Sequence, residues 1–215
     1  MLERKGSRET YVKTLIDRIE DNQHQRHNEI DEYFKELFNL NIIFPVKLLA
    51  ILFDVIENSY YLLKGELLYR ILGYVAEKVE EKDFTYLSKL AADHIKGLLG
   101  RFERDIHFED RPLMLWMFAL ICFYVDQKFE PYSRTAYLQG LEAIFIFEDG
   151  SHYMNQNNRS FKFNGRELLN HSFTIYEKID PKILHEVIEF GAANGTPEIK
   201  SICKVLRVFA ASNKD

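Results

Sequence analysis

Cysteine is scarce in this chain of 215 residues, and its basic residues are too few to balance the acidic ones. Its only two cysteines, Cys122 and Cys203, each lie inside an apolar stretch, where a thiol packs as a small hydrophobic group. We therefore expect both to be free, buried and unreactive. The 28 Lys and Arg residues against 33 Asp and Glu leave a formal charge of −5, which repels phosphate backbones. The composition thus argues against nucleic acid as a partner.

Long uncharged runs are missing as well. Residues 42–56 contain Lys47 and Asp54, and residues 112–125 are uncharged but number only about 14. Because a membrane-spanning helix needs roughly 20 apolar residues, both stretches are expected to be helices of a protein core. The first ten residues contain no apolar stretch of the kind that a secretory signal requires. These features predict a cytoplasmic protein without a membrane span.

Short catalytic and cofactor motifs are not found in their required context. Gly191 and Gly195 follow a helical pattern and precede Thr196-Pro197, which indicates the end of one helix and the start of the next, not a phosphate-binding loop. The histidines and carboxylates within residues 20–31 fall on one exposed helix, which alone cannot surround a metal ion. The sequence therefore predicts no cofactor and no metal site, and it assigns no catalytic residue.

Proline gives the clearest signal of organisation, although the chain has only five. Each proline stands at the start of an apolar pattern with a period of 3.6 residues, which is typical of the first turn of a helix. Asp180 and Thr196 precede two of them and are favourable N-cap residues, because their side-chain oxygens accept hydrogen bonds from free backbone N–H groups. The prolines are Pro45, Pro112, Pro131, Pro181 and Pro197.

Apolar stripes without a leading proline mark further helices, as within residues 67–79 and 84–99. The predicted fold class is all-α, with about eight or nine helices in a single domain over residues 1–215, because no linker divides the chain. The helix starts are irregularly spaced and no residue signature recurs. An irregular, solenoid-like helical array and a multi-helix bundle therefore both remain open. The starts lie near residues 45, 65, 83, 111, 131, 165, 181 and 197.

The N-terminal stretch contains neither glycine nor proline from residue 7 to residue 39. Its apolar positions keep one helical phase across a polar middle at residues 20–29. We therefore predict one long helix over about residues 7–39, with two shorter helices as the alternative. A helical core at about residues 45–147 and C-terminal helices at about residues 165–211 complete the expected organisation.

Residues 148–164 form the one stretch without helical periodicity, and loops of this length in compact proteins are usually functional or disordered. Strict alternation occurs only in residues 160–164, so at most one small hairpin is expected near residues 151–163. The amide, imidazole, phenol and guanidinium groups of the loop suit adaptable polar recognition, which predicts binding of a partner, with an incidental surface insertion as the alternative. The loop residues predicted to bind are His152, Tyr153, Asn155, Asn157, Asn158 and Arg159.

A tyrosine cluster supplies the second predicted binding surface. Tyr60 and Tyr61, followed by Tyr69 and Tyr74, lie near two glycines that would allow close approach of another helix. A tyrosine ring gives contact area at low entropic cost while its hydroxyl stays hydrated. We predict that Tyr60 and Tyr61 face a partner, with ordinary half-buried packing of the cluster as the alternative.

These expectations favour an intracellular protein–protein interaction module, of the scaffold, adaptor or regulatory kind, with a protein partner and no catalysis of its own. The alternative is an enzyme or small-ligand binder whose pocket lies between helices and is closed by loop 148–164. It would use His152, His185 or His94 as an acid or base. His94 also has an ordinary interpretation, since it falls on an apolar stripe and would pack there.

Overall fold

The structure is a computed structural model, and it divides into two compact units, residues 1–67 and residues 68–215. The single domain expected over residues 1–215 therefore stays a prediction. The residues that the structure describes are 2–22, 27–40, 43, 45–58, 64–100, 111–128, 130–146, 152–154, 160–162 and 172–212.

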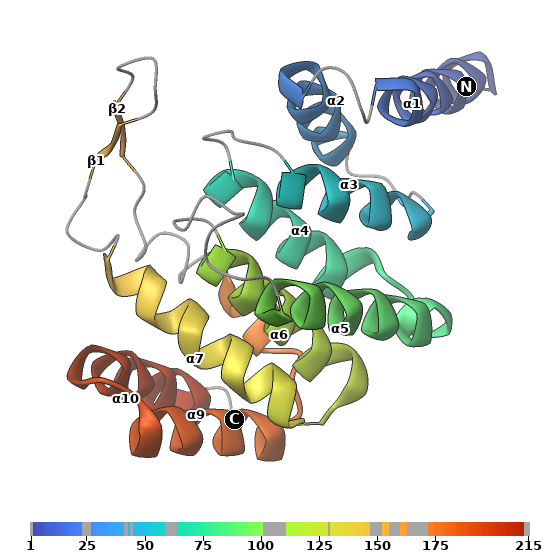
Figure 1. The fold of residues 1–215 in the computed structure, drawn as a ribbon. Coiled ribbons are helices and arrows are strands. Elements are labelled where there is room, and N and C mark those ends of the chain that lie inside the picture. The colour runs from blue at the N-terminus through green and yellow to red at the C-terminus, as the bar shows by residue number, and fades with distance from the viewer. Residues whose placement is uncertain are drawn as a thin grey trace. The chain divides into compact units, whose positions relative to one another are not determined.

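Helices make up nearly all of the described elements, so the predicted all-α class is confirmed (Figure 1). The first unit contains α1 (Leu2–Asn22), α2 (His27–Asn39) and α3 (Lys47–Asn58), and α4 (Lys64–Lys78) crosses the boundary between the units. The second unit contains a 3-10 turn (Glu81–Asp83), α5 (Phe84–Gly100), α6 (Arg111–Asp126), α7 (Pro131–Ile146), a helical segment at residues 172–176, α9 (Pro181–Asn194) and α10 (Pro197–Ser212).

Helix α6 is the centre of the second unit. It packs against α5 and α7, and α7 in turn contacts α9 and α10 (Figure 1). All side chains from Leu113 to Phe123 are buried, and Trp116 is fully so. A helix that is apolar all round is stable when other helices surround it, which confirms the predicted core position of this stretch. Among the described helices, none is both long and apolar enough to cross a membrane.

The prolines mark helix starts, as predicted. Helices α7, α9 and α10 begin with proline, α6 has one at its second position, and Pro45 precedes α3 by two residues. The Asp180 carboxylate accepts a hydrogen bond from the Lys182 backbone N–H at 2.7 Å, at the start of α9. The Thr196 hydroxyl accepts one from the Ile199 backbone N–H at 3.4 Å, at the start of α10. Both predicted N-caps are therefore confirmed.

The single N-terminal helix predicted over residues 7–39 is wrong, because α1 and α2 are two helices that pack against each other. They run antiparallel: the Tyr11 hydroxyl donates to the Glu36 carboxylate, and the Arg18 guanidinium lies 5.7 Å from the centre of the Tyr33 ring. Apolar positions keep the same helical phase on both sides of the polar middle. Periodicity alone therefore could not distinguish one helix from a folded-back pair.

Gln127, in the turn between α6 and α7, has a φ of 49°, which is uncommon for a residue with a side chain. Its side-chain amide nitrogen donates to the Tyr124 carbonyl at 2.7 Å and to the Lys178 carbonyl at 3.3 Å. Its amide oxygen accepts from the Asp180 backbone N–H at 2.7 Å. These bonds join the end of α6 to the turn before α9, and they offset the cost of the left-handed backbone conformation.

The end of α9 approaches α10 so closely that Gly195 leaves no room for a side chain. A Cβ at Gly195 would lie 2.6 Å from the Gly191 carbonyl oxygen and closer still to Ile199 Cγ2. Because part of the obstacle is backbone, Gly195→Ala should lower the free energy of unfolding by about 2–3 kcal/mol in urea titrations. The control is Gly97→Ala in α5, where nothing lies within 4 Å; it should raise stability by about 0.5–1 kcal/mol. Equal stability of the two variants would contradict this packing.

Candidate functional site

A group of polar and titratable side chains gathers where α5, α6 and α7 meet. We call it the α5–α7 junction; its members are Ser88 and Lys96 on α5, Cys122 and Asp126 on α6, and Tyr132 on α7. The Ser88 hydroxyl donates to the Asp126 carboxylate at 2.8 Å. A further hydrogen bond joins the Tyr132 hydroxyl and the Cys122 thiol, and the Lys96 ammonium lies 5.5 Å from the centre of the Tyr132 ring.

Burial governs the chemistry of this junction. It raises the pKa of the Cys122 thiol to about 12, and the negative charge of Asp126 adds to the shift. It also raises the pKa of Tyr132 to about 12, with further contributions from Cys122 and Asp126. Since the thiolate is the reactive form of cysteine, neither group supplies a nucleophile at neutral pH. The junction is a hydrogen-bonded contact between three helices.

Both thiols should be unreactive in the folded protein. Cys122 and Cys203 are free and buried, as predicted, with exposed fractions of 2% and 0%. Burial raises the pKa of Cys203 to about 11. We expect Ellman's reagent at pH 8 to modify neither thiol in native protein and both in concentrated guanidinium chloride. Fast reaction of either thiol before unfolding would contradict the burial of that side chain.

A second polar group lies wholly inside the core, between α6, α7 and residues 172–176. The Trp116 indole N–H donates to the Tyr176 hydroxyl at 3.3 Å, and the Tyr176 and Tyr137 hydroxyl oxygens are 3.0 Å apart. All three side chains are fully buried. Burial is the largest cause that raises the pKa of both tyrosines. We call this the Trp–Tyr–Tyr chain; its members satisfy one another and do not reach the surface.

The histidines of the enzymatic alternative lie in ordinary helical settings. The His94 ring on α5 stacks on Phe118, with ring centres 4.9 Å apart and planes at 15°. His185 on α9 is exposed. Glu189, one turn further along α9, forms a two-point ion pair with Arg207 on α10, at 3.0 and 2.9 Å. His94 thus packs on its stripe, and Glu189, four residues after His185, serves the α9–α10 contact.

Most of the predicted binding residues lie outside the described part of the chain. The hairpin itself is present, with β1 (His152–Met154) antiparallel to β2 (Ser160–Lys162) and Tyr153 opposite Phe161. His152 and Tyr153 therefore lie on a described strand, whereas their binding role stays a prediction. Tyr74, which accompanies the other predicted tyrosines, is only 8% exposed, in agreement with the packing alternative. The predicted residues outside the described ranges are Tyr60, Tyr61, Asn155, Asn157, Asn158 and Arg159.

The outer face of α10 carries a feature that was not predicted from the sequence. Val205 and Val208 are 50% and 68% exposed, and they lie on one face with the exposed Ser201 and Ser212, at spacings of four, three and four residues. We call these four residues the α10 stripe. Among the side chains whose exposure the structure describes, the valines are the only large exposed apolar ones that share an element. The full set of such side chains is Tyr11, Ile43, Tyr86, Val205 and Val208.

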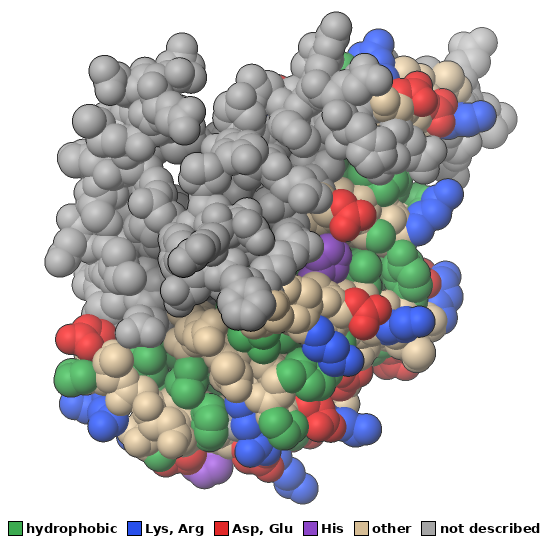
Figure 2. Space-filling model, viewed as in Figure 1, with side chains coloured by type: hydrophobic (Ala, Val, Ile, Leu, Met, Phe, Trp, Pro, Cys, Tyr) green, Lys and Arg blue, Asp and Glu red, His purple; other side chains and the backbone are tan. Residues whose placement is uncertain are grey.

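Different side chains border the α10 stripe on its two sides. On one side, the half-buried Phe209 stacks on Phe173, with ring centres 4.4 Å apart and planes at 11°. On the other side run the basic residues Lys200, Lys204 and Arg207. Figure 2 shows apolar side chains set among charged groups of both signs over α9 and α10. The stripe is thus continuous with the apolar core on one side and rimmed by charge on the other.

The remaining indications of function are negative. Among the residues that the structure describes, no group of three or more His, Cys, Asp or Glu side chains is placed to hold a metal ion. The junction and the Trp–Tyr–Tyr chain both serve helix packing, whereas the α10 stripe is a feature of the described surface that packing does not explain. No protein-family model, no curated protein and no solved structure matches the chain.

Proposed function

We propose that this chain is a protein–protein interaction module, of the scaffold, adaptor or regulatory kind, without catalysis of its own. The observation that carries the proposal is the α10 stripe, where Val205 and Val208 are exposed side by side at the edge of the Phe173–Phe209 stack. Removing apolar surface from water is worth about 25 cal/mol per Å². An exposed apolar patch with a polar rim is a common mark of a protein-binding surface.

The polar groups of the second unit also support a binding role. Cys122 and Tyr132 keep their protons well above neutral pH, and the tyrosines of the Trp–Tyr–Tyr chain bond one another inside the core. His94 is stacked on a phenylalanine, which suits packing better than acid–base catalysis. The two buried free thiols suit a reducing compartment, and we propose the cytoplasm as the place where the protein works.

The hairpin of β1 and β2 is a second candidate surface, in keeping with the role predicted for loop 148–164. Both strands of a two-stranded sheet are edge strands, and each directs some backbone N–H and C=O groups away from its partner strand. A two-stranded hairpin is only marginally stable in water. An extended segment of a partner would bond to such an edge and stabilise it.

The proposal is tested by capture from a cell lysate with the full chain as bait. Val208→Glu places a charge in the α10 stripe, and His185→Glu places the same charge on the exposed face of α9 as a control. We expect wild type and His185→Glu to capture the same set of partners. The amount captured by Val208→Glu should be at least about tenfold lower, which corresponds to a loss of about 1.4 kcal/mol in binding free energy. Undiminished capture by Val208→Glu contradicts the assignment of this face. A bait with residues 154–159 replaced by a Gly-Ser linker tests the hairpin in the same way.

A further inference from the structure

The form of the α10 stripe determines what kind of segment can cover it. Ser201 and Ser212 end a straight row that spans about 16 Å, or three helical turns. A helix face offers no free backbone groups for strand addition, so the contact must be made by side chains. Apolar side chains at helical spacing interlock with those of a second helix, and small serines at both ends allow the two to approach closely. The stripe therefore fits an amphipathic helix.

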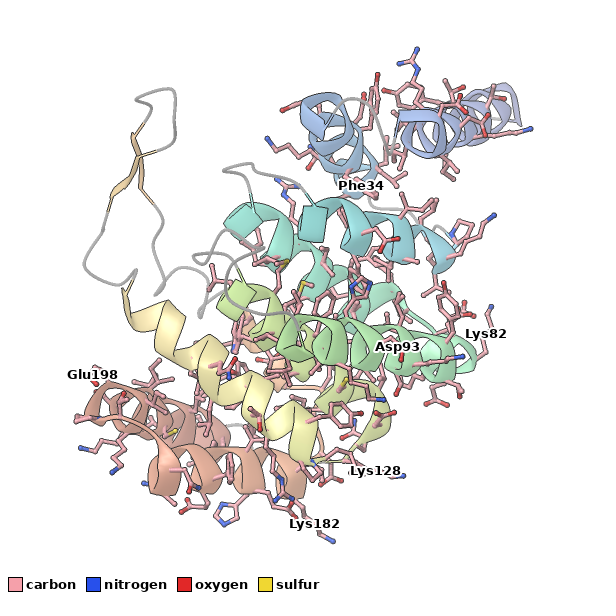
Figure 3. The ribbon with its side chains drawn as sticks, in the orientation of Figure 1. Phe34, Lys82, Asp93, Lys128, Lys182 and Glu198 are labelled. Carbon is pink, nitrogen blue, oxygen red and sulfur yellow. The ribbon has the colours of Figure 1, made fainter. Side chains whose placement is uncertain are left out.

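The charge beside the stripe determines which flank that helix needs. Lys200 and Lys204 are exposed one turn apart, and residues 199–212 contain no Asp or Glu. Arg207 is already paired with Glu189, whereas in the described part of the chain neither lysine forms an ion pair. Glu198, at the N-terminal end of α10, is the only acidic residue of this helix (Figure 3). The row next to the stripe is thus positive in a chain whose formal charge is −5.

We infer that the α10 stripe binds an amphipathic helix of another protein that carries Asp or Glu along the flank facing Lys200 and Lys204. The inference rests on the proposed function and names its partner class. Opposite charges at the rim guide association and select among partners, while the apolar stripe supplies most of the affinity. The valines define where the partner helix lies on α10. The lysines define its orientation and the acidic charge that its flank must carry.

A second copy of the chain in an antiparallel pair fits this surface poorly. In an antiparallel two-fold pair of α10 helices, each flank faces the same flank of the other copy. The row of Lys200, Lys204 and Arg207 would then face its own equivalent, and like charges would oppose each other.

The test uses two synthetic helical peptides with the same leucine stripe, one flanked by Glu and the other by Lys. Their binding to the full chain is measured by fluorescence anisotropy at about 50 mM salt. We expect the Glu-flanked peptide to bind at least about fivefold more tightly, and this difference to shrink at about 500 mM salt as screening increases. Lys200→Glu combined with Lys204→Glu should reverse the preference. Val208→Ser should weaken the binding of both peptides about tenfold, and His185→Glu should leave the binding of both unchanged.

Three outcomes would overturn the inference. They are equal binding of the two peptides, binding of neither at about 100 μM, and a preference that the double lysine variant leaves unchanged. Sedimentation of the wild-type chain adds a fourth: a dimer at micromolar concentration that Val208→Ser abolishes would identify a second copy as the occupant. The proposed function is judged separately, by the dependence of lysate capture on Val208, so the inference can fail while the function stands.

Discussion

Raising the pH from 9 to 11 is expected to lower the free energy of unfolding of this protein by several kcal/mol. The Cys122 and Cys203 thiols have pKa values raised from 9.0 to about 12 and about 11, and burial raises the pKa values of Tyr137 and Tyr176 above 10.0. The folded protein therefore holds protons that the unfolded chain releases above these ordinary values. The stabilisation is complete below pH 9 and is lost as the pH rises toward the folded-state pKa values.

The size of this loss follows from the number of groups involved. Each one reduces the free energy of unfolding by about 1.4 kcal/mol per pH unit once the unfolded chain ionises. Two thiols and two phenols together give a loss of roughly 8 kcal/mol by pH 11, against a total stability of about 5–15 kcal/mol for a typical protein. Circular dichroism and urea titrations at stepped pH values measure it.

The control for alkaline unfolding is Cys122→Ala. This variant lacks one of the four groups. Between pH 9.5 and 10.5 the slope of its free energy of unfolding against pH should therefore be smaller than that of wild type by about 1.4 kcal/mol per pH unit. Tyr86→Phe changes an exposed tyrosine and should leave the slope as it is. A free energy of unfolding that stays constant to pH 11.5 would show that these side chains are not buried in solution.

Removing the hydroxyl of Tyr176 should destabilise the protein more than removing that of Tyr137. Tyr176 is the middle member of the Trp–Tyr–Tyr chain, so Tyr176→Phe leaves both the Trp116 N–H and the Tyr137 hydroxyl without this partner in a fully buried site. Each buried polar group left unpaired costs about 1–3 kcal/mol. We expect a loss of about 3 kcal/mol for Tyr176→Phe and about 1–2 kcal/mol for Tyr137→Phe, by urea titration.

The double variant separates the hydrogen bonds from simple loss of packing. In the Tyr176→Phe variant the buried Tyr137 hydroxyl has lost this partner and destabilises the fold. Adding Tyr137→Phe to that variant should therefore change the free energy of unfolding little or should raise it. The two substitutions should therefore be strongly non-additive. Additive losses, or a smaller loss for Tyr176→Phe than for Tyr137→Phe, would contradict the central position of Tyr176 in the chain.

Local sequence signals predicted the helices well, because the causes of helix starts are local. Proline has a fixed φ and lacks an N–H, so Pro131, Pro181 and Pro197 mark the first residues of α7, α9 and α10 whatever packs against them. The N-cap Asp180 acts over two residues and was equally visible. The break between α1 and α2 was missed because the apolar positions keep one helical phase on both sides of it, and only the tertiary packing of the two helices reveals the fold-back.

The candidate site was harder to predict for a similar reason. Ser88, Cys122 and Tyr132 come from three helices, and no spacing in the sequence brings them together. The α10 stripe, by contrast, was present in the sequence: Val205 and Val208 interrupt what would otherwise be a polar outer face. The buried face of the same helix gives the stronger apolar periodicity, so the two exposed valines did not stand out beside it. The predicted binding residues of loop 148–164 came from composition, which indicates a role in recognition without indicating where each side chain lies.

The central claim is that the outer face of α10 contacts another protein, and site-specific photo-crosslinking in cells tests it most directly. A photoreactive amino acid is placed at Val205 or Val208, and at two exposed control positions, Lys182 on α9 and Lys89 on α5. We expect the valine positions to crosslink to a distinct polypeptide, and the control positions to give several-fold less of that product. Equal crosslinking at all four positions, or none at the two valines, would contradict the claim.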